Sequence, residues 1–249
     1  MTLRSHSRLL AILLLASACA GRSPNLENQT ADQLFERGMT ELRNRKWTQA
    51  TEIFERFTLQ FPTHPRVQEA RFRLGEAFYG RKEFISSATE FNRLASDFPA
   101  GPWADDARFR VCESYARMSP KPVLDQLYTR AAYDHCISVE QQYPNSEFVA
   151  RANELASQML NRLAEKEFRR GDFYYKRKAY DSSITYFEAT VRDYPRSTWA
   201  PRSLLRLFQA FTSIGYKEEA EAAKARLIKE YPNSEAAREV QGNAVAKAS

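Results

Sequence analysis

The chain has 249 residues, a formal net charge of +6 and 43% hydrophobic side chains, which is enough to build a sizeable core. Only eight glycines occur, and no run alternates in the manner of a strand, so the composition argues against a β-rich fold. The charge excess is too mild to indicate a nucleic-acid partner. Length and pattern together favour one elongated all-α domain.

Residues 1–18 are expected to be a secretory signal peptide. Arg4 and Arg8 form a basic region, Leu9 to Leu15 is apolar, and small residues follow. This apolar run is too short to span a bilayer as a mature helix.

Cys19 directly follows these small residues, in an arrangement that resembles the bacterial lipobox. The resemblance implies cleavage before Cys19 and lipidation of that cysteine, with residues 19–30 as a flexible tether. Ala20 is not the aspartate that retains lipoproteins at the inner membrane, so the outer membrane is favoured. An ordinary signal peptide with a chance cysteine is the alternative.

One aromatic pattern recurs through the remaining chain. Each regular copy has an aromatic residue, a glycine three positions later and then a second aromatic-rich segment. The first copy begins at Phe35 and the second at Phe72, a step of 37 residues. A period of this size is typical of a repeat made of two helices. Five segments end at an aromatic-proline pair. The prolines of these pairs are Pro62, Pro99, Pro144, Pro195 and Pro232. The pattern therefore predicts an α-solenoid of about five helix hairpins.

The glycines at the same slot of each first helix predict close helix packing. Gly38, Gly75 and Gly171 lie inside helical segments, where glycine costs about 1 kcal/mol relative to alanine. That cost indicates a contact between the two helices of each hairpin that leaves no room for a side chain.

Two insertions interrupt the period. Pro120 and Pro122 forbid a continuous helix, so the third hairpin is expected to carry a protruding loop. Residues 147–178 contain no proline and keep helical spacing, which predicts one long helix that opens the fourth hairpin. We therefore divide the chain into residues 31–144, with repeats one to three, and residues 145–249, with the long helix, repeats four and five and a terminal helix.

Catalytic and metal-binding motifs are not found. The sequence has three histidines, and His135 beside Cys136 cannot face one point from adjacent helical positions. No glycine-rich phosphate loop occurs. We expect no cofactor and no metal, and a binding scaffold rather than an enzyme.

A basic cluster in the long helix permits two interpretations. It consists of Arg162, Lys166, Arg169, Arg170 and Lys176. It is either a solvated helix face or a docking surface for an acidic partner domain.

Cys112 and Cys136 occupy the slots held elsewhere by the inward glycine and by an inward phenylalanine. We expect them to lie close together in hairpin three. Whether they are bonded stays open, because an oxidising compartment favours a disulfide, whereas helix axes 8–10 Å apart and the inertness of buried thiols oppose it.

The lipobox, the hairpins, the proline-rich irregularity and the segment from Asn161 through Tyr174 to Pro195 resemble the BamD family of outer-membrane β-barrel assembly lipoproteins. The resemblance implies tetratricopeptide-like repeats and a role without catalysis. It implies that the C-terminal repeats bind the periplasmic POTRA domains of a BamA-type barrel protein. It also implies other assembly lipoproteins as partners, no nucleic acid, and membrane contact through the lipid alone.

The resemblance further implies that the N-terminal repeats receive unfolded outer-membrane proteins in a concave groove. The candidate groove residues are Phe35, Met39, Phe72, Glu76, Tyr79, Phe109 and Glu113. Core packing is the alternative role for the aromatic residues among them. The alternative function is that of CpoB-like periplasmic proteins, which coordinate peptidoglycan synthesis with envelope constriction. Those carry an N-terminal coiled coil, and no heptad run precedes residue 32 here.

Overall fold

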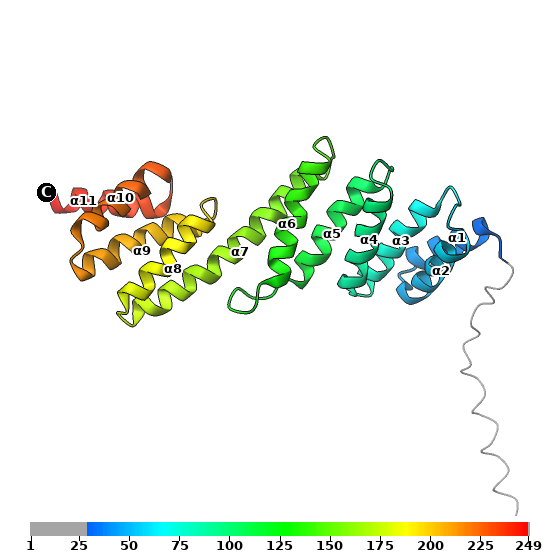
Figure 1. Cartoon of the computed structure of the whole chain (residues 1–249), viewed down its shortest axis with the longest axis horizontal. Coiled ribbons are helices and arrows are strands. Elements are labelled where there is room, and N and C mark those ends of the chain that lie inside the picture. The colour runs from blue at the N-terminus through cyan, green and yellow to red at the C-terminus, as the bar shows by residue number, and fades with distance from the viewer. Residues whose placement is uncertain (1–28, 249) are drawn as a thin grey trace, which may run out of the picture.

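A computed structural model describes residues 29–248, which form eleven helices and no strand. The helices are α1 (Ala31–Arg43), α2 (Trp47–Gln60), α3 (Val67–Gly80), α4 (Phe84–Asp97), α5 (Ala104–Met118), α6 (Leu127–Gln142), α7 (Val149–Lys176), α8 (Tyr180–Asp193), α9 (Trp199–Ile214), α10 (Lys217–Glu230) and α11 (Glu235–Ala248). Successive helices pair into antiparallel hairpins that stack in an elongated row (Figure 1). The predicted all-α solenoid of five hairpins is confirmed, with α11 as a terminal helix.

The inward glycines mark the joint between the two helices of a hairpin. A Cβ atom added at Gly38 would lie 2.8 Å from the ring of Phe54. At Gly75 the same atom would lie 2.7 Å from the ring of Phe91, and Gly171 repeats this contact with the second helix of its own hairpin. These distances are too short for real Cβ contacts, so the ring of each second helix rests directly on the backbone of the first. We call this contact the glycine–phenylalanine joint.

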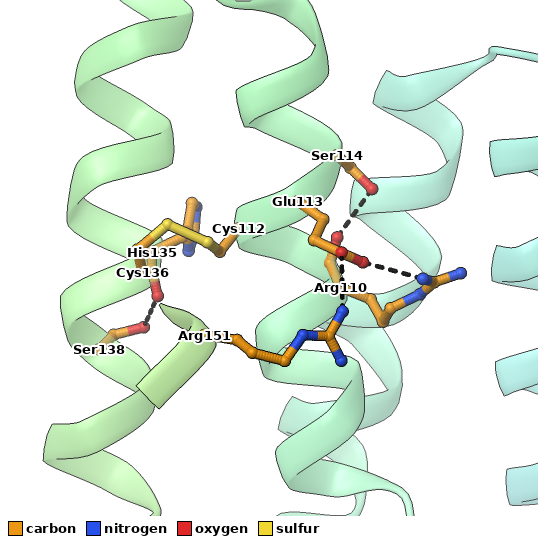
Figure 2. Close-up of a disulfide and its surroundings, with 8 residues drawn as sticks. All are labelled: Arg110, Cys112, Glu113, Ser114, His135, Cys136, Ser138 and Arg151. Carbon is orange, nitrogen blue, oxygen red and sulfur yellow. Dashed lines mark hydrogen bonds and ion pairs between the residues drawn. A yellow bond between two sulfur atoms is a disulfide. The ribbon is translucent and has the colours of Figure 1, made fainter. Parts of the chain in front are cut away.

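Hairpin three, formed by α5 and α6, replaces this joint by a covalent one. Cys112 and Cys136 lie at the glycine and phenylalanine positions, with 4.9 Å between their Cα atoms, and their sulfur atoms form a disulfide (Figure 2). Both side chains are fully buried. Because each Cα atom lies about 2.3 Å from its helix axis, facing Cα atoms can approach this closely while the axes keep the usual separation of 8–10 Å. The axis separation therefore does not oppose the bond.

The turn inside a hairpin has a left-handed residue at the same place in four of the five hairpins. Arg45, Lys82 and Lys178 have φ between 57° and 63°, and Gly215 has φ of 82°. A side chain at such a φ is strained, and glycine relieves the strain only in hairpin five.

The long helix α7 joins the two halves of the row. It has 28 residues and is continuous from Val149 to Lys176, as the absence of proline and glycine breaks in its first half predicts. Ala152 and Ala156 pack with Cys112 and Cys136 in one core cluster. Farther along the same helix, Phe168 packs against the cluster of hairpins four and five. One rigid helix thus contributes to two cores.

The first helices of neighbouring hairpins contact each other directly. α1 packs on α3, α5 on α7, and α7 on α9. No pair of second helices makes comparable contacts among the described residues, so the first helices line the concave, inner side of the row. Within residues 29–248, no helix is both long enough and apolar enough to cross a bilayer.

Candidate functional site

Charged residues of the first helices form a continuous ladder along the inner side of hairpins one to three. Arg66 pairs with Glu36 of α1 at 2.8 Å and with Glu69 of α3 at 3.4 Å. Three ion pairs carry the ladder from one hairpin to the next, through Arg66 with Glu36, Arg110 with Glu76, and Arg151 with Glu113. Its members, in order, are Glu36, Arg66, Glu69, Arg73, Glu76, Arg110, Glu113 and Arg151. Four acids alternate with four arginines, so these eight side chains together have no net charge.

The arginines of the ladder cover aromatic rings of the core. The guanidinium carbon of Arg66 lies 3.4 Å from the ring centre of Phe35, and that of Arg151 lies 4.5 Å from the ring centre of Phe109. Arg110 lies 5.0 Å from the ring of Tyr79. A planar guanidinium can stack on a ring and still bind carboxylates through its edge. The arginines of the ladder therefore separate the aromatic core from solvent.

This arrangement corrects part of the expected groove. Phe35 has no exposed area, and Phe72 and Phe109 are each 2% exposed. They are core residues and do not line an open groove, because Arg66, Trp103 and Phe148 from the following hairpins lie against their rings.

The other candidate groove residues remain reachable from solvent. Met39, Glu76, Tyr79 and Glu113 are partly exposed. Tyr79 lies beside the ladder, and burial, with a contribution from Glu113, raises the pKa of its hydroxyl. A peptide-binding role for these four residues stays a prediction.

Asp106 is the most perturbed acid at the ladder. Burial raises the pKa of its carboxyl to about 6; Arg110 opposes this rise, whereas Glu76, Asp105 and Glu113 add to it. Burial therefore makes this carboxyl easier to protonate than a free aspartate, even though Arg110 lies nearby.

Two cations of the basic cluster in α7 are engaged inside the molecule. Arg162 donates from Nη1 to the backbone oxygen of Ser119 at 3.0 Å and to its Oγ at 2.8 Å. Lys166 donates to the backbone oxygen of Leu124 at 3.0 Å. These two side chains hold the loop of hairpin three against the long helix, and a docking role for them stays a prediction.

The remaining cations of the cluster stay exposed but have partners on their own helix. Arg169 pairs with Glu165 at 2.6 Å, and Lys176 pairs with Asp172 at 2.6 Å. Arg170 pairs with a carboxylate one turn earlier at 3.2 Å. Both interpretations given above remain open for these three residues.

An aromatic surface on α7 and α8 was missed from the sequence. Phe173 is 48% exposed, and the guanidinium carbon of Arg177 lies 3.5 Å from its ring centre. Tyr174 stacks on Tyr186 with 5.4 Å between ring centres and meets Phe173 edge-on. Arg170, whose guanidinium carbon lies 6.0 Å from the ring centre of Tyr186, lies at the edge of this group. We call these five residues the α7–α8 surface. The sequence signal for this surface was Phe173, an aromatic residue on the polar side of the helical pattern.

The loop of hairpin three presents a second apolar patch. Val123 and Leu127 are about two-thirds exposed, at 67% and 66%, and Leu124 is 55% exposed. The buried amide of Gln126 donates to the backbone oxygens of Lys121 and Leu124, so the loop has a fixed shape.

His135 is partly buried. Its ring stacks on that of Tyr115, with 5.0 Å between centres, and burial lowers its pKa. Among residues 29–248, no group of three or more His, Cys, Asp or Glu side chains is placed to hold a metal. Cys19 and the expected signal peptide lie outside the described residues.

The chain is similar in sequence to a known family and to several characterised relatives. The model of the YfiO family, described as outer membrane lipoprotein, matches residues 27–227. The chain is 27% identical over 230 residues to outer membrane protein assembly factor BamD of Caulobacter vibrioides, with 90% of this chain and 75% of that protein covered. It is 24% identical over 240 residues to the factor of the same name from Vibrio cholerae, covering 90% of this chain and 97% of that protein.

A solved structure similar to the chain is the complex of the TPR2AB domain of yeast Sti1 with pHSP90, at 12% identity and a TM-score of 0.42, covering 83% of this chain and 80% of that one. The family model matches residues 27–227, which is most of the chain. The chain therefore belongs to the YfiO family of outer membrane lipoproteins, which includes the BamD assembly factors.

Proposed function

We propose that this chain is a scaffold without catalytic activity in the machinery that assembles outer-membrane proteins. It is anchored at the periplasmic face of the outer membrane by lipid on Cys19. Membership of the family and the relatives named as assembly factors support the role in assembly. The stacked hairpins and their extended surfaces suit the binding of partners.

The partner that we assign to the C-terminal half is the POTRA region of a BamA-type barrel protein. The observation that carries this proposal is the α7–α8 surface, where Phe173 and Arg177 lie exposed on a rigid helix. Aromatic residues and arginine are enriched among the residues that dominate binding energy, and a rigid platform loses little conformational entropy on binding. Arg169 and Lys176 stand near this surface and favour an acidic partner.

The ligand that we assign to the N-terminal half is an extended segment of an unfolded outer-membrane protein. The ladder supports this assignment because its polar atoms lie in a row along successive first helices. Glu76, Tyr79 and Glu113 offer hydrogen-bond partners along that row, while Met39 adds an adaptable apolar contact near its start.

Copurification tests the scaffold role. The chain with an affinity tag is extracted from membranes in detergent, and the bound barrel protein is quantified. We expect the barrel protein to copurify with the natural chain, and the Phe173→Ala/Arg177→Ala variant to retain at most about a tenth of it. Leu59→Ala is the matched control, because Leu59 is 82% exposed on hairpin one. Absence of any barrel protein from the natural chain would overturn the proposal.

Site-specific crosslinking tests the peptide site. A photoreactive residue at position 79 should crosslink to a synthetic segment that ends in the C-terminal strand of an outer-membrane protein. The same residue at position 192, on the exposed end of α8, is the control and should give no crosslink above background. Equal crosslinking at the two positions would contradict binding along the ladder.

A further inference from the structure

The disulfide replaces the contact that closes other hairpins. In hairpins one, two and four, a phenylalanine ring of the second helix packs on a glycine of the first. Hairpin three has neither residue, and its joint is the bond between Cys112 and Cys136. Two reduced cysteines would fill far less space than a phenylalanine ring, so the helices would lose most of the contact that holds the other pairs together.

Hairpin three also has the longest connection within a hairpin that the described residues contain. Residues 119–126 link α5 to α6, whereas the turn of hairpin two occupies only residues 81–83. A longer link makes closure of the pair entropically less favourable. The bond joins residues 24 positions apart and removes much of that cost from the unfolded chain.

Burial limits when the bond can form. Cys112 and Cys136 have no exposed area, and they pack in one cluster with Ala152 and Ala156 of α7. Disulfide exchange requires a thiolate to reach a sulfur atom of its partner directly. A protein oxidant cannot reach these sulfur atoms once α7 has covered hairpin three.

We propose that oxidation of Cys112 and Cys136 precedes the docking of α7 on hairpin three, so the chain is a substrate of a protein that carries an oxidising disulfide. One cysteine thiolate attacks that disulfide, which forms a mixed disulfide and releases a thiolate of the oxidant. The second cysteine thiolate attacks the mixed disulfide, the bond of hairpin three forms, and the oxidant leaves as a dithiol. The two cysteines lose two protons and two electrons, and the oxidant's disulfide accepts both electrons.

The position of the bond indicates what its absence would change. Figure 2 shows the disulfide between α5 and α6, while Glu113, next to Cys112, turns to the ladder and pairs with Arg110 and Arg151. Loosening of hairpin three would therefore disturb the ladder and the first half of α7 together. Hairpins one and two, whose joints are non-covalent, should stay folded.

The test compares the oxidised chain with the chain reduced in denaturant and refolded in tris(2-carboxyethyl)phosphine. We expect the reduced chain to unfold about 5–10 °C lower. Amide exchange should lose protection in α5, α6 and the first half of α7, with hairpins one and two unchanged. The reductant should cleave the bond at least about 100-fold more slowly in the folded oxidised chain than in denaturant.

Two variants keep the test sharp. Cys112→Gly/Cys136→Phe rebuilds the joint of the other hairpins and should melt at the same temperature with and without reductant. Cys112→Ser/Cys136→Ser should melt at the same temperature as the reduced chain. If the first variant does not fold, the comparison of this serine variant with the oxidised chain tests the proposal. Equal melting of the oxidised, reduced and serine forms would overturn the proposal, and so would equal rates of reduction in folded and denatured chains. Two free thiols in chain purified from cells and denatured without reductant would also overturn it.

Discussion

The inner side of the first three hairpins and the α7–α8 surface use arginine and aromatic rings in opposite ways. On the inner side, Arg66 and Arg151 lie over rings that are buried, and each arginine also binds carboxylates. On α7, Arg177 lies over Phe173, whose ring is half exposed. The first arrangement stabilises the fold, and the second leaves apolar area for a partner. The same pair of residue types therefore indicates function only when the ring is exposed.

The largest expected effect separates the two kinds of ring. Phe72→Ala should cost about 3–5 kcal/mol of unfolding free energy, because it empties a buried site that Trp103 and Phe91 surround. Phe173→Ala should cost less than about 1.5 kcal/mol, because half of that ring is already in water. Chemical denaturation of both variants measures the difference. Similar costs would show that the ring of Phe173 is buried in solution.

The next effect concerns the centre of the ladder. Arg110→Glu should cost about 2–3 kcal/mol, because it places a third carboxylate beside Glu76 and Glu113 and uncovers the ring of Tyr79. Arg192→Glu is the control, since Arg192 pairs only at the surface of α8. The control should be nearly neutral in chemical denaturation, as is usual for exposed pairs. A neutral Arg110→Glu would mean that the ladder does not stabilise the fold.

A smaller effect should depend on pH. The pKa of Asp106 is raised to about 6 in the folded chain, so the folded state holds this proton more tightly than the unfolded chain does. The resulting stabilisation is complete below about pH 4, where Asp106 is protonated in both states, and it is lost as the pH rises through 6. Asp106→Asn should therefore gain stability above pH 6 and none below pH 4, as measured by denaturation at each pH. A gain independent of pH would contradict the raised pKa.

The smallest effect lies in a turn. Lys82 has φ of 63°, a conformation in which a side chain is strained. Lys82→Gly should raise the unfolding free energy by about 0.5–1 kcal/mol. Lys82→Ala keeps the strain and should give no gain, so the comparison of their melting temperatures isolates the backbone term. A destabilised glycine variant would show that unfolded-state entropy outweighs the strain.

The sequence predicted the fold well because its main signals are local and repeated. The 37-residue step from Phe35 to Phe72 and the inward glycines follow from contacts within one hairpin. The docking residues were harder to predict because the partners that decide their role lie far away in sequence. Arg162 binds Ser119, 43 positions earlier, and Arg66 binds Glu36, 30 positions earlier. The sequence did contain one sign of the ladder. Charged residues stand one and four positions after a core phenylalanine, as Arg73 and Glu76 do after Phe72.

Equilibrium binding of the soluble POTRA region to the chain with Cys19→Ala tests the central claim most directly, because it asks which surface holds the assembly partner. We predict that Phe173→Ala/Arg177→Ala weakens binding by about 30-fold, a loss of about 2 kcal/mol. Tyr79→Ala, on the inner side, should leave the affinity within about twofold of the natural value. Loss of affinity in the Tyr79 variant with full affinity in the α7–α8 variant would contradict the division of roles between the two surfaces.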